Sequence, residues 1–117
     1  MYAVVVSYEV DAIDRIFIVM EYVKRDLNQL MAQMDDGKFT NNHVIALAYN
    51  LLCGINLMHQ ANIFHRDLKP AKILVTDKCT VKICDFGLAR SIKGKKQRPM
   101  SPHVGSKFYS APEVICD

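Results

Sequence analysis

The chain has 117 residues, of which half are hydrophobic and 23% are charged, and its formal net charge is +3. This length suits one modest domain with a single core, and the composition is typical of a globular, soluble chain. So small a net charge argues against nucleic-acid binding, and no apolar run reaches the roughly 18 residues of a membrane span. Residues 1–6 contain neither a basic leader nor a cleavage site, so we expect no secretory signal.

The four cysteines form no C-x-x-C pair and have no metal-ligand spacing with the four histidines. We therefore expect four reduced thiols that act as small apolar groups, as in an intracellular protein. They are Cys53, Cys79, Cys84 and Cys116.

Two N-terminal segments, residues 2–10 and 15–22, are rich in Val, Ile, Phe and Tyr and are separated by residues 11–14. This pattern predicts an antiparallel pair of strands. A short amphipathic helix should follow from Asp26, whose carboxylate favours a helix N-terminus through the helix dipole. Its apolar positions have the i, i+3, i+4, i+7 spacing and are Leu27, Leu30, Met31 and Met34.

A longer helix should begin at Thr40 or Asn41, either of which can cap it, and should end at residues 60–62. Seven apolar positions follow the helical period, and we expect them in the core: Val44, Leu47, Ala48, Leu51, Leu52, Ile55 and Met58.

Two short strands, residues 73–75 and 80–83, should flank a turn at residues 76–79. Beyond Arg90 the periodicity is lost, and Gly, Lys, Ser and Pro indicate a surface loop. A basic run in this loop has no interleaved aromatic residues, which favours a solvated segment over a nucleic-acid patch. The run comprises Lys93, Lys95, Lys96 and Arg98.

Three motifs then carry the chemistry: His-Arg-Asp-Leu-Lys-Pro at residues 65–70, Asp-Phe-Gly at 85–87 and Ala-Pro-Glu at 111–113. One carboxylate can accept the proton of an attacking hydroxyl, and another can hold Mg²⁺. The predicted strand pair places Asp67 just before one strand and Asp85 just after the other, so both can approach one pocket. In this order the motifs resemble the signature set of eukaryotic protein kinases.

The resemblance implies an α+β, protein-kinase-like fold, of which the chain would be a part. Residues 1–23 would be the last strands of the small lobe and the hinge. Residues 24–117 would be the front half of the helical large lobe through the activation segment. The family's glycine-rich loop, phosphate-binding lysine and C-terminal helices have no counterpart in the sequence. We therefore interpret the chain as a fragment, a truncated gene model or a degenerate kinase-derived protein.

The resemblance implies that Asp67 is the catalytic carboxylate and that Lys69 neutralises charge on the transferring phosphoryl group. Lys69-Pro70 is typical of Ser/Thr kinases. His65 would support the backbone near Asp85, and Asp85 would ligate Mg²⁺.

For ATP, the resemblance implies adenine contacts from the hinge, ribose contacts from Asp26, and a floor formed by Leu74, with Cys84 bordering the pocket. The hinge residues are Met20, Glu21, Tyr22 and Val23. An ordinary edge strand would explain the hinge segment equally simply, helix capping would explain Asp26, and core packing would explain Leu74.

One position departs from the template, which has Asn five residues after the catalytic Asp, where this chain has Lys72. An amide oxygen can bind Mg²⁺, whereas an ammonium group is a cation without an acceptor. Lys72 would repel the ion or compete with it for Asp85. Impaired catalysis follows unless Lys72 itself neutralises phosphate.

Within the kinases, residues 26–28, 59–63 and 81–90 are similar to the mitogen-activated (CMGC) group. By this resemblance Ser101 takes the place of the activating phospho-threonine, and Arg66 would bind its phosphate. His103 stands where the paired tyrosine would be, so dual phosphorylation is not expected.

The function implied is ATP-dependent phosphorylation of Ser/Thr in protein substrates, in the cytoplasm or nucleus and under an upstream kinase. The first alternative is a catalytically impaired or inert kinase-derived binding protein. The second is a small-molecule phosphotransferase, against which Lys69-Pro70 and the motif at 111–113 argue.

Overall fold

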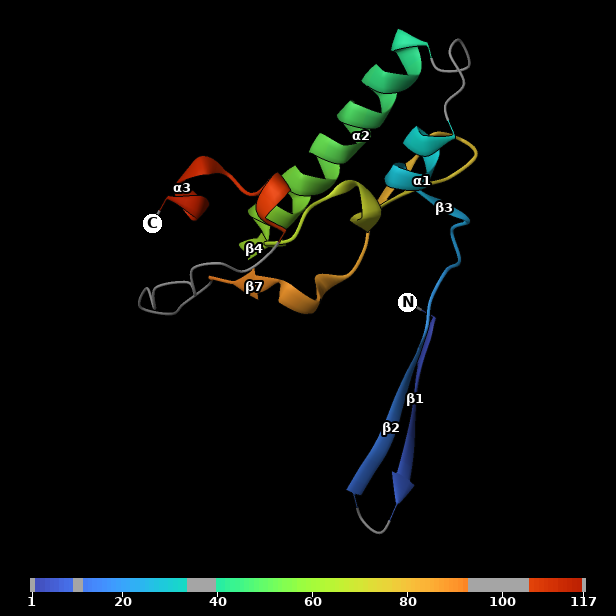
Figure 1. The fold of residues 1–117 in the computed structure, drawn as a ribbon. Helices are drawn as coiled ribbons and strands as arrows, with labels where there is room; N and C mark the ends of the chain where they lie inside the picture. Colours follow the sequence, from blue (N-terminus) through green and yellow to red (C-terminus); the bar gives the residue numbers. More distant parts are fainter. Residues whose placement is uncertain (1, 10–11, 34–39, 93–105, 117) are drawn as a thin grey trace.

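The structure is a computed structural model that describes residues 2–9, 12–33, 40–92 and 106–116. Strands and helices are mixed, and a long N-terminal hairpin projects from a body built around one long helix (Figure 1). None of the helices in these ranges is both long enough and apolar enough to cross a membrane.

The hairpin consists of β1 (Ala3–Glu9) and β2 (Ala12–Val19), which pair antiparallel as the sequence predicts. The expectation that residues 11–14 interrupt the strands was wrong for residues 12–14, which belong to β2. The register explains why: Ser7 lies opposite Arg15 and Tyr8 opposite Ile13, so Asp14 is an extra residue in a bulge. The bulge lets the pairing continue past an unfavourable residue.

The two predicted helices are α1 (Leu27–Ala32) and α2 (Asn41–Gln60). Asp26 caps α1, because its carboxylate accepts a hydrogen bond from the Gln29 backbone N–H at 2.7 Å. Thr40 is the N-cap of α2, and its backbone N–H donates to Nδ1 of His43 at 3.2 Å. The predicted helix position Met34 lies outside the described residues.

A three-stranded antiparallel sheet in the order β3-β5-β6 lies beside α2. Its strands are β3 (Arg25–Asp26), β5 (Ile73–Val75) and β6 (Val81–Ile83), of which the last two form the predicted hairpin. Helix α2 approaches β6 closely at Gly54, where an added Cβ would lie 3.2 Å from Cδ1 of Ile83. The register places Asp26 opposite Leu74, so two predicted nucleotide contacts are neighbours.

A second small sheet joins β4 (Ile63–Phe64) to β7 (Arg90–Ser91). The prediction of a loop beyond Arg90 was wrong at Ser91, because a strand of two residues has no detectable periodicity. The pairing ties the segment after the Asp-Phe-Gly motif to the segment just before the His-Arg-Asp-Leu-Lys-Pro motif. The remaining elements are η1 (Pro70–Lys72), η2 (Phe86–Leu88), η3 (Lys107–Tyr109) and α3 (Pro112–Ile115).

The core within the described residues is small. Its buried apolar side chains are Leu47, Ile73 and Val75, and His65 is buried with them. Of the seven α2 positions predicted as core, Val44, Ala48 and Leu52 are exposed, which corrects that expectation. One face of α2 packs on β6 and β4, and nothing in the described ranges covers the other face.

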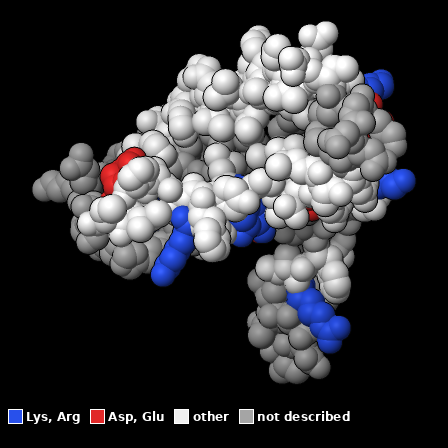
Figure 2. All heavy atoms as spheres, turned by 45° about the horizontal axis from the view of Figure 1, so that its top comes forward, with Lys and Arg blue, Asp and Glu red and all other residues white. Residues whose placement is uncertain are grey.

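The four cysteines are free thiols, and two of them, Cys53 and Cys116, are exposed instead of packed in the core. On the face shown in Figure 2, the Lys and Arg side chains of the described residues stand apart from one another. They form no continuous basic patch on that face.

Candidate active site

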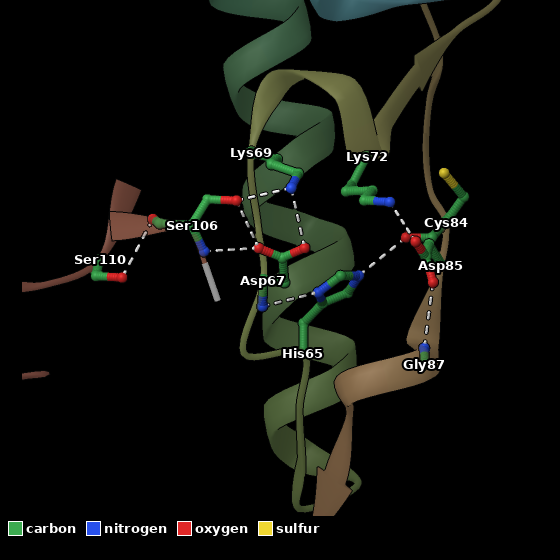
Figure 3. A network of polar contacts seen from close by, with 9 residues as sticks. All are labelled: His65, Asp67, Lys69, Lys72, Cys84, Asp85, Gly87, Ser106 and Ser110. Atoms are coloured by element: carbon green, nitrogen blue, oxygen red, sulfur yellow. Dashed lines mark hydrogen bonds and ion pairs between the residues drawn. The ribbon is translucent and has the colours of Figure 1, made fainter. Parts of the chain in front are cut away.

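His65 links the two halves of the site. It is 2% exposed, its Nε2 donates a hydrogen bond to the Cys84 carbonyl at 2.9 Å, and its Nδ1 accepts from the Asp67 backbone N–H at 3.3 Å (Figure 3). One imidazole therefore holds the backbone at Asp67 close to Cys84, the residue that precedes Asp85. This matches the supporting role predicted for His65.

Asp67 and Lys69 lie together with Ser106, which comes from the far end of the chain (Figure 3). Oδ1 of Asp67 accepts from the Ser106 backbone N–H at 2.9 Å and from its Oγ at 3.1 Å. Nζ of Lys69 lies 3.2 Å from Oδ2 of Asp67 and donates to Oγ of Ser106 at 2.7 Å. The carboxylate and the ammonium group thus converge on one hydroxyl oxygen.

The charge state of Asp67 follows from these contacts. Burial raises the pKa of this carboxyl group, whose side chain is only 13% exposed. The hydrogen bonds from Lys69 and Ser106 and the charge of Lys69 outweigh burial, so the pKa of Asp67 lies below its usual value of 3.8. Asp67 is therefore an ionised carboxylate at neutral pH.

Asp85 lies across the site and forms an ion pair with Lys72. Oδ2 of Asp85 accepts from Nζ of Lys72, and Oδ1 accepts from the Gly87 backbone N–H at 3.3 Å. The hydrogen bond from Lys72, then the one from Gly87 and the charge of Lys72, lower the pKa of Asp85. The hydrogen bond to Asp85 in turn raises the pKa of Lys72, so both groups are ionised at neutral pH.

The residues predicted to contact ATP are only partly gathered. Asp26 and Leu74 are register neighbours in the sheet, and half-buried Cys84 follows β6 directly. Burial raises the pKa of the Cys84 thiol. Residues 20–23 lie outside any strand, with Met20 65% exposed and Tyr22 85% exposed. The Glu21 side chain accepts from Lys82 of β6 at 2.8 Å, which ties this segment to the sheet.

Of the two residues predicted to regulate the site, the structure describes Arg66 and not Ser101. Nε of Arg66 donates to the Leu88 carbonyl at 2.7 Å, in the segment that follows Asp85. Ser101 lies outside the described residues, as do His103 and the basic run at residues 93–98.

Comparisons with known proteins identify the family. The model of the protein kinase domain family matches residues 2–117. The chain belongs to the protein kinase family. Its relatives include the mitogen-activated protein kinase homolog NTF3 of Nicotiana tabacum, which is 40% identical over 104 residues. That match covers 87% of this chain and 27% of the tobacco protein.

Two further relatives agree with this assignment. The stress-activated protein kinase jnk-1 of Caenorhabditis elegans is 43% identical, over 92% of this chain and 22% of that protein. The mitogen-activated protein kinase spm1 of Schizosaccharomyces pombe is 36% identical, over 92% of this chain and 27% of that protein. The chain thus spans about a quarter of the length of these relatives. It has a partial protein-kinase-like fold of the α+β class and is similar to mitogen-activated Ser/Thr kinases.

The protein kinase family generally uses ATP and Mg²⁺, but the described residues do not fit a Mg²⁺ ion. Mg²⁺ takes oxygen ligands, chiefly carboxylates, in near-octahedral geometry. Both oxygens of Asp85 are engaged, by Lys72 and Gly87, and both oxygens of Asp67 by Ser106 and Lys69. Within the described ranges, no group of three or more His, Cys, Asp or Glu residues could hold a metal ion. The carboxylates of Asp67 and Asp85 are both present, but the one predicted to bind Mg²⁺, Asp85, is already paired with the ammonium group of Lys72.

Sequence reasoning missed Ser106. Four serines, Ser91, Ser101, Ser106 and Ser110, lie between the second and third kinase motifs, and no chemical pattern distinguishes Ser106 from the others. Its role depends on closure of a loop over 39 positions of chain, from Asp67 to Ser106. The usable signal was indirect: once a kinase-like fold is assumed, the segment between the second and third motifs is expected near Asp67.

Replacement of Ser106 by Ala should raise the pKa of Asp67. The change removes the hydroxyl hydrogen bond that lowers this pKa, and burial, which raises it, remains. Because the folded-state pKa of Asp67 is depressed, its contacts stabilise the folded state at pH values above the unfolded-state pKa. This stabilisation is lost as the pH falls through the folded-state pKa.

Carboxyl ¹³C NMR titration between pH 2 and 6 measures the shift in the pKa of Asp67. Ser110→Ala, whose hydroxyl bonds only the Ser106 carbonyl at 3.2 Å, is the matched control. An unchanged Asp67 titration in Ser106→Ala would contradict the assignment.

Proposed function

We propose that the chain carries the phosphoryl-transfer centre of an ATP-dependent Ser/Thr protein kinase of the mitogen-activated type. The observation that supports this most is the convergence of Asp67 and Lys69 on Oγ of Ser106, at 3.1 and 2.7 Å. A substrate hydroxyl needs the same two contacts: a carboxylate to receive its proton and a cation beside it. Family membership and the relatives named above support the substrate class.

In the proposed transfer, one bond to the γ-phosphorus forms and another breaks. The hydroxyl oxygen of a substrate Ser or Thr attacks the γ-phosphorus of ATP, and its proton passes to the Asp67 carboxylate. The bond between the γ-phosphorus and the bridging oxygen breaks, and ADP leaves. Lys69 stabilises charge on the transferring group, and its contact with Oδ2 of Asp67 at 3.2 Å holds it beside the base.

We propose that ATP lies against the end of the β3-β5-β6 sheet. Backbone groups of residues 20–23 would bind adenine, Asp26 the ribose, and Leu74 and Cys84 would line the pocket. The register pair Asp26–Leu74 and the Lys82–Glu21 bond support this placement. Residues 1–23 are then the small-lobe part with the hinge, and residues 24–117 the large-lobe part. The free thiols support an intracellular setting, which we propose is the cytoplasm or nucleus.

A segment-swap chimera tests the function. In it, residues 2–117 of this chain replace the matching segment of the tobacco relative, which supplies the remaining three quarters of a kinase. We expect transfer of label from γ-³²P-ATP to a basic protein substrate, with label on Ser and Thr after acid hydrolysis. Label on a small-molecule acceptor alone would instead indicate a phosphotransferase. No transfer to any acceptor, with ATP binding retained, would favour the second candidate function.

That second candidate is a catalytically impaired kinase that acts as a binding protein. The Lys72–Asp85 ion pair favours it specifically, because the predicted metal carboxylate is already paired. In this case the chimera binds ATP and protein partners at normal affinity but transfers phosphate at a rate close to background.

We also propose that phosphorylation of Ser101 orders the activation segment through Arg66. A phosphate adds about −1.5 to −2 charges at neutral pH and forms strong charge-assisted bonds with arginine. Arg66 already contacts this segment through the Leu88 carbonyl at 2.7 Å. In the chimera, phosphorylation at Ser101 by an upstream kinase should slow proteolysis between residues 93 and 105 several-fold, and Arg66→Ala should abolish the protection. Arg25→Ala, which removes only the pair with Asp77, is the control. Equal cleavage with and without phosphate would leave Ser101 as a turn residue.

A further inference from the structure

Lys72 is held in place by the fold as well as by its charge. It is the last residue of η1, and its backbone N–H donates to the Lys69 carbonyl at 2.8 Å. Its own carbonyl accepts from the Cys84 backbone N–H at 3.0 Å. Cys84, which directly precedes Asp85, is thereby tied to the backbone of Lys72, so the two members of the ion pair come from backbone segments that are bonded to each other.

The surroundings of Lys72 are those of a bound cation. Its side chain is 23% exposed, and the hydrogen bond to Asp85, together with the charges of Asp85 and Asp67, raises its pKa. Figure 3 shows Lys69 and Lys72 extending from the same loop, one towards Asp67 and the other towards Asp85. Each of the two carboxylates of the kinase motifs therefore has a lysine ammonium group beside it.

We propose that the Lys72 ammonium group replaces the divalent cation at Asp85, so that the chain binds nucleotide polyphosphate without Mg²⁺. This inference rests on the nucleotide site of the proposed function. An ammonium group has three donors. Asp85 uses one donor of Lys72, which leaves two for phosphate oxygens, and Lys69, bonded to Asp67 and Ser106, retains one. The loop thus offers three donors and two charges to a polyphosphate.

The same pair excludes a metal ion from Asp85. Mg²⁺ would have to displace an ammonium group that the backbone tethers beside the carboxylate, at a high effective concentration. It would then lie close to a positive charge, which repels it. Removal of the ammonium group should therefore convert a metal-independent site into a metal-dependent one.

Calorimetric titration of the chain with ATP, in excess EDTA and in excess Mg²⁺, tests the phosphate part. We expect the wild-type chain to bind ATP equally well in both buffers. Lys72→Asn, which restores the template residue, should bind at least tenfold more weakly in EDTA and should recover in Mg²⁺. Lys78→Asn makes the same change at an exposed position of the 76–79 turn and should match the wild type.

A second measurement tests the metal part without nucleotide. Mn²⁺ broadens the NMR signals of nearby amides, and Gly87, bonded to Asp85, is the reporter. We expect no selective broadening at Gly87 in the wild type, clear broadening in Lys72→Asn, and its loss in the double variant with Asp85→Asn.

The outcomes separate the inference from the proposed function. Wild-type binding of ATP that needs Mg²⁺, or Mn²⁺ broadening at Gly87 in the wild type, overturns the inference and leaves the nucleotide site intact. No Mn²⁺ broadening in Lys72→Asn also overturns it, because the vacated carboxylate would then not be a metal site. Absence of ATP binding by every variant in both buffers overturns the proposed nucleotide site together with the inference.

Discussion

Replacement of Asp67 by Asn in the segment-swap chimera should reduce the rate of phosphoryl transfer by about 10²- to 10⁴-fold, the usual contribution of a positioned general base. An amide cannot receive the substrate proton at neutral pH. Its oxygen can still accept the bonds that Asp67 accepts from the N–H and Oγ of Ser106, so the loop geometry should survive. The loss should therefore appear in kcat, with ATP affinity almost unchanged.

Single-turnover kinetics and ATP titration on the same preparations separate these two quantities. Asp77→Asn is the matched control, because Asp77 is 86% exposed and, among the described residues, its ion-pair partner is Arg25 at 3.3 Å. Its rate should equal that of the parent chimera. Asp67 would lose its role as proton acceptor if Asp67→Asn kept the parental kcat, and it would be a binding residue if only ATP affinity fell.

The local elements that position the two carboxylates could be predicted from the sequence. The β-branched runs on either side of residues 76–79 indicate a hairpin, and β5 and β6 form it. The start of α1 at Asp26 could be predicted as well, and the cap of α2 was narrowed to Thr40 or Asn41, of which Thr40 is the N-cap, because capping depends on one or two adjacent residues. Such signals are short in range, and the sequence displays them directly.

Long-range closure could not be predicted in the same way. The bonds from Ser106 to Asp67 and the β4–β7 pair join segments far apart in the chain, and each involves too few residues for a pattern. The prediction that the apolar stripe of α2 is buried failed for another reason. Periodicity identifies an apolar stripe, but Val44 and Leu52 are exposed because no described element packs on them.

The interaction of Lys72 with Asp85 could be predicted only in part. Its departure from the template is visible in the sequence, and competition for Asp85 followed from charge alone. The sequence could not show that a backbone bond from Cys84 to Lys72 joins the two segments that carry the ion pair. This bond brings the Lys72 side chain within reach of the Asp85 carboxylate, with which it pairs.

Lys72→Asn in the segment-swap chimera should raise Mg²⁺-supported phosphoryl transfer by about 10- to 100-fold, the range typical when a metal site regains or loses a supporting ligand. The substitution frees Oδ2 of Asp85 and supplies an amide oxygen. The pKa of Asp85, which Lys72 lowers, should rise towards 3.8 in the metal-free variant. Asp85 then stays ionised at neutral pH, so a change in protonation cannot explain the gain in rate.

Initial rates across a Mg²⁺ titration decide between the two candidate functions. The parent chimera should transfer slowly at every Mg²⁺ concentration, because its Asp85 is paired with Lys72. Lys72→Asn should show saturable activation by Mg²⁺, and Lys78→Asn should follow the parent. Activation confined to Lys72→Asn would mean that one side chain separates this chain from an ordinary kinase centre. Equal curves for the parent and Lys72→Asn would show that Lys72 is tolerated in catalysis, and any impairment would then have to arise elsewhere in the chain.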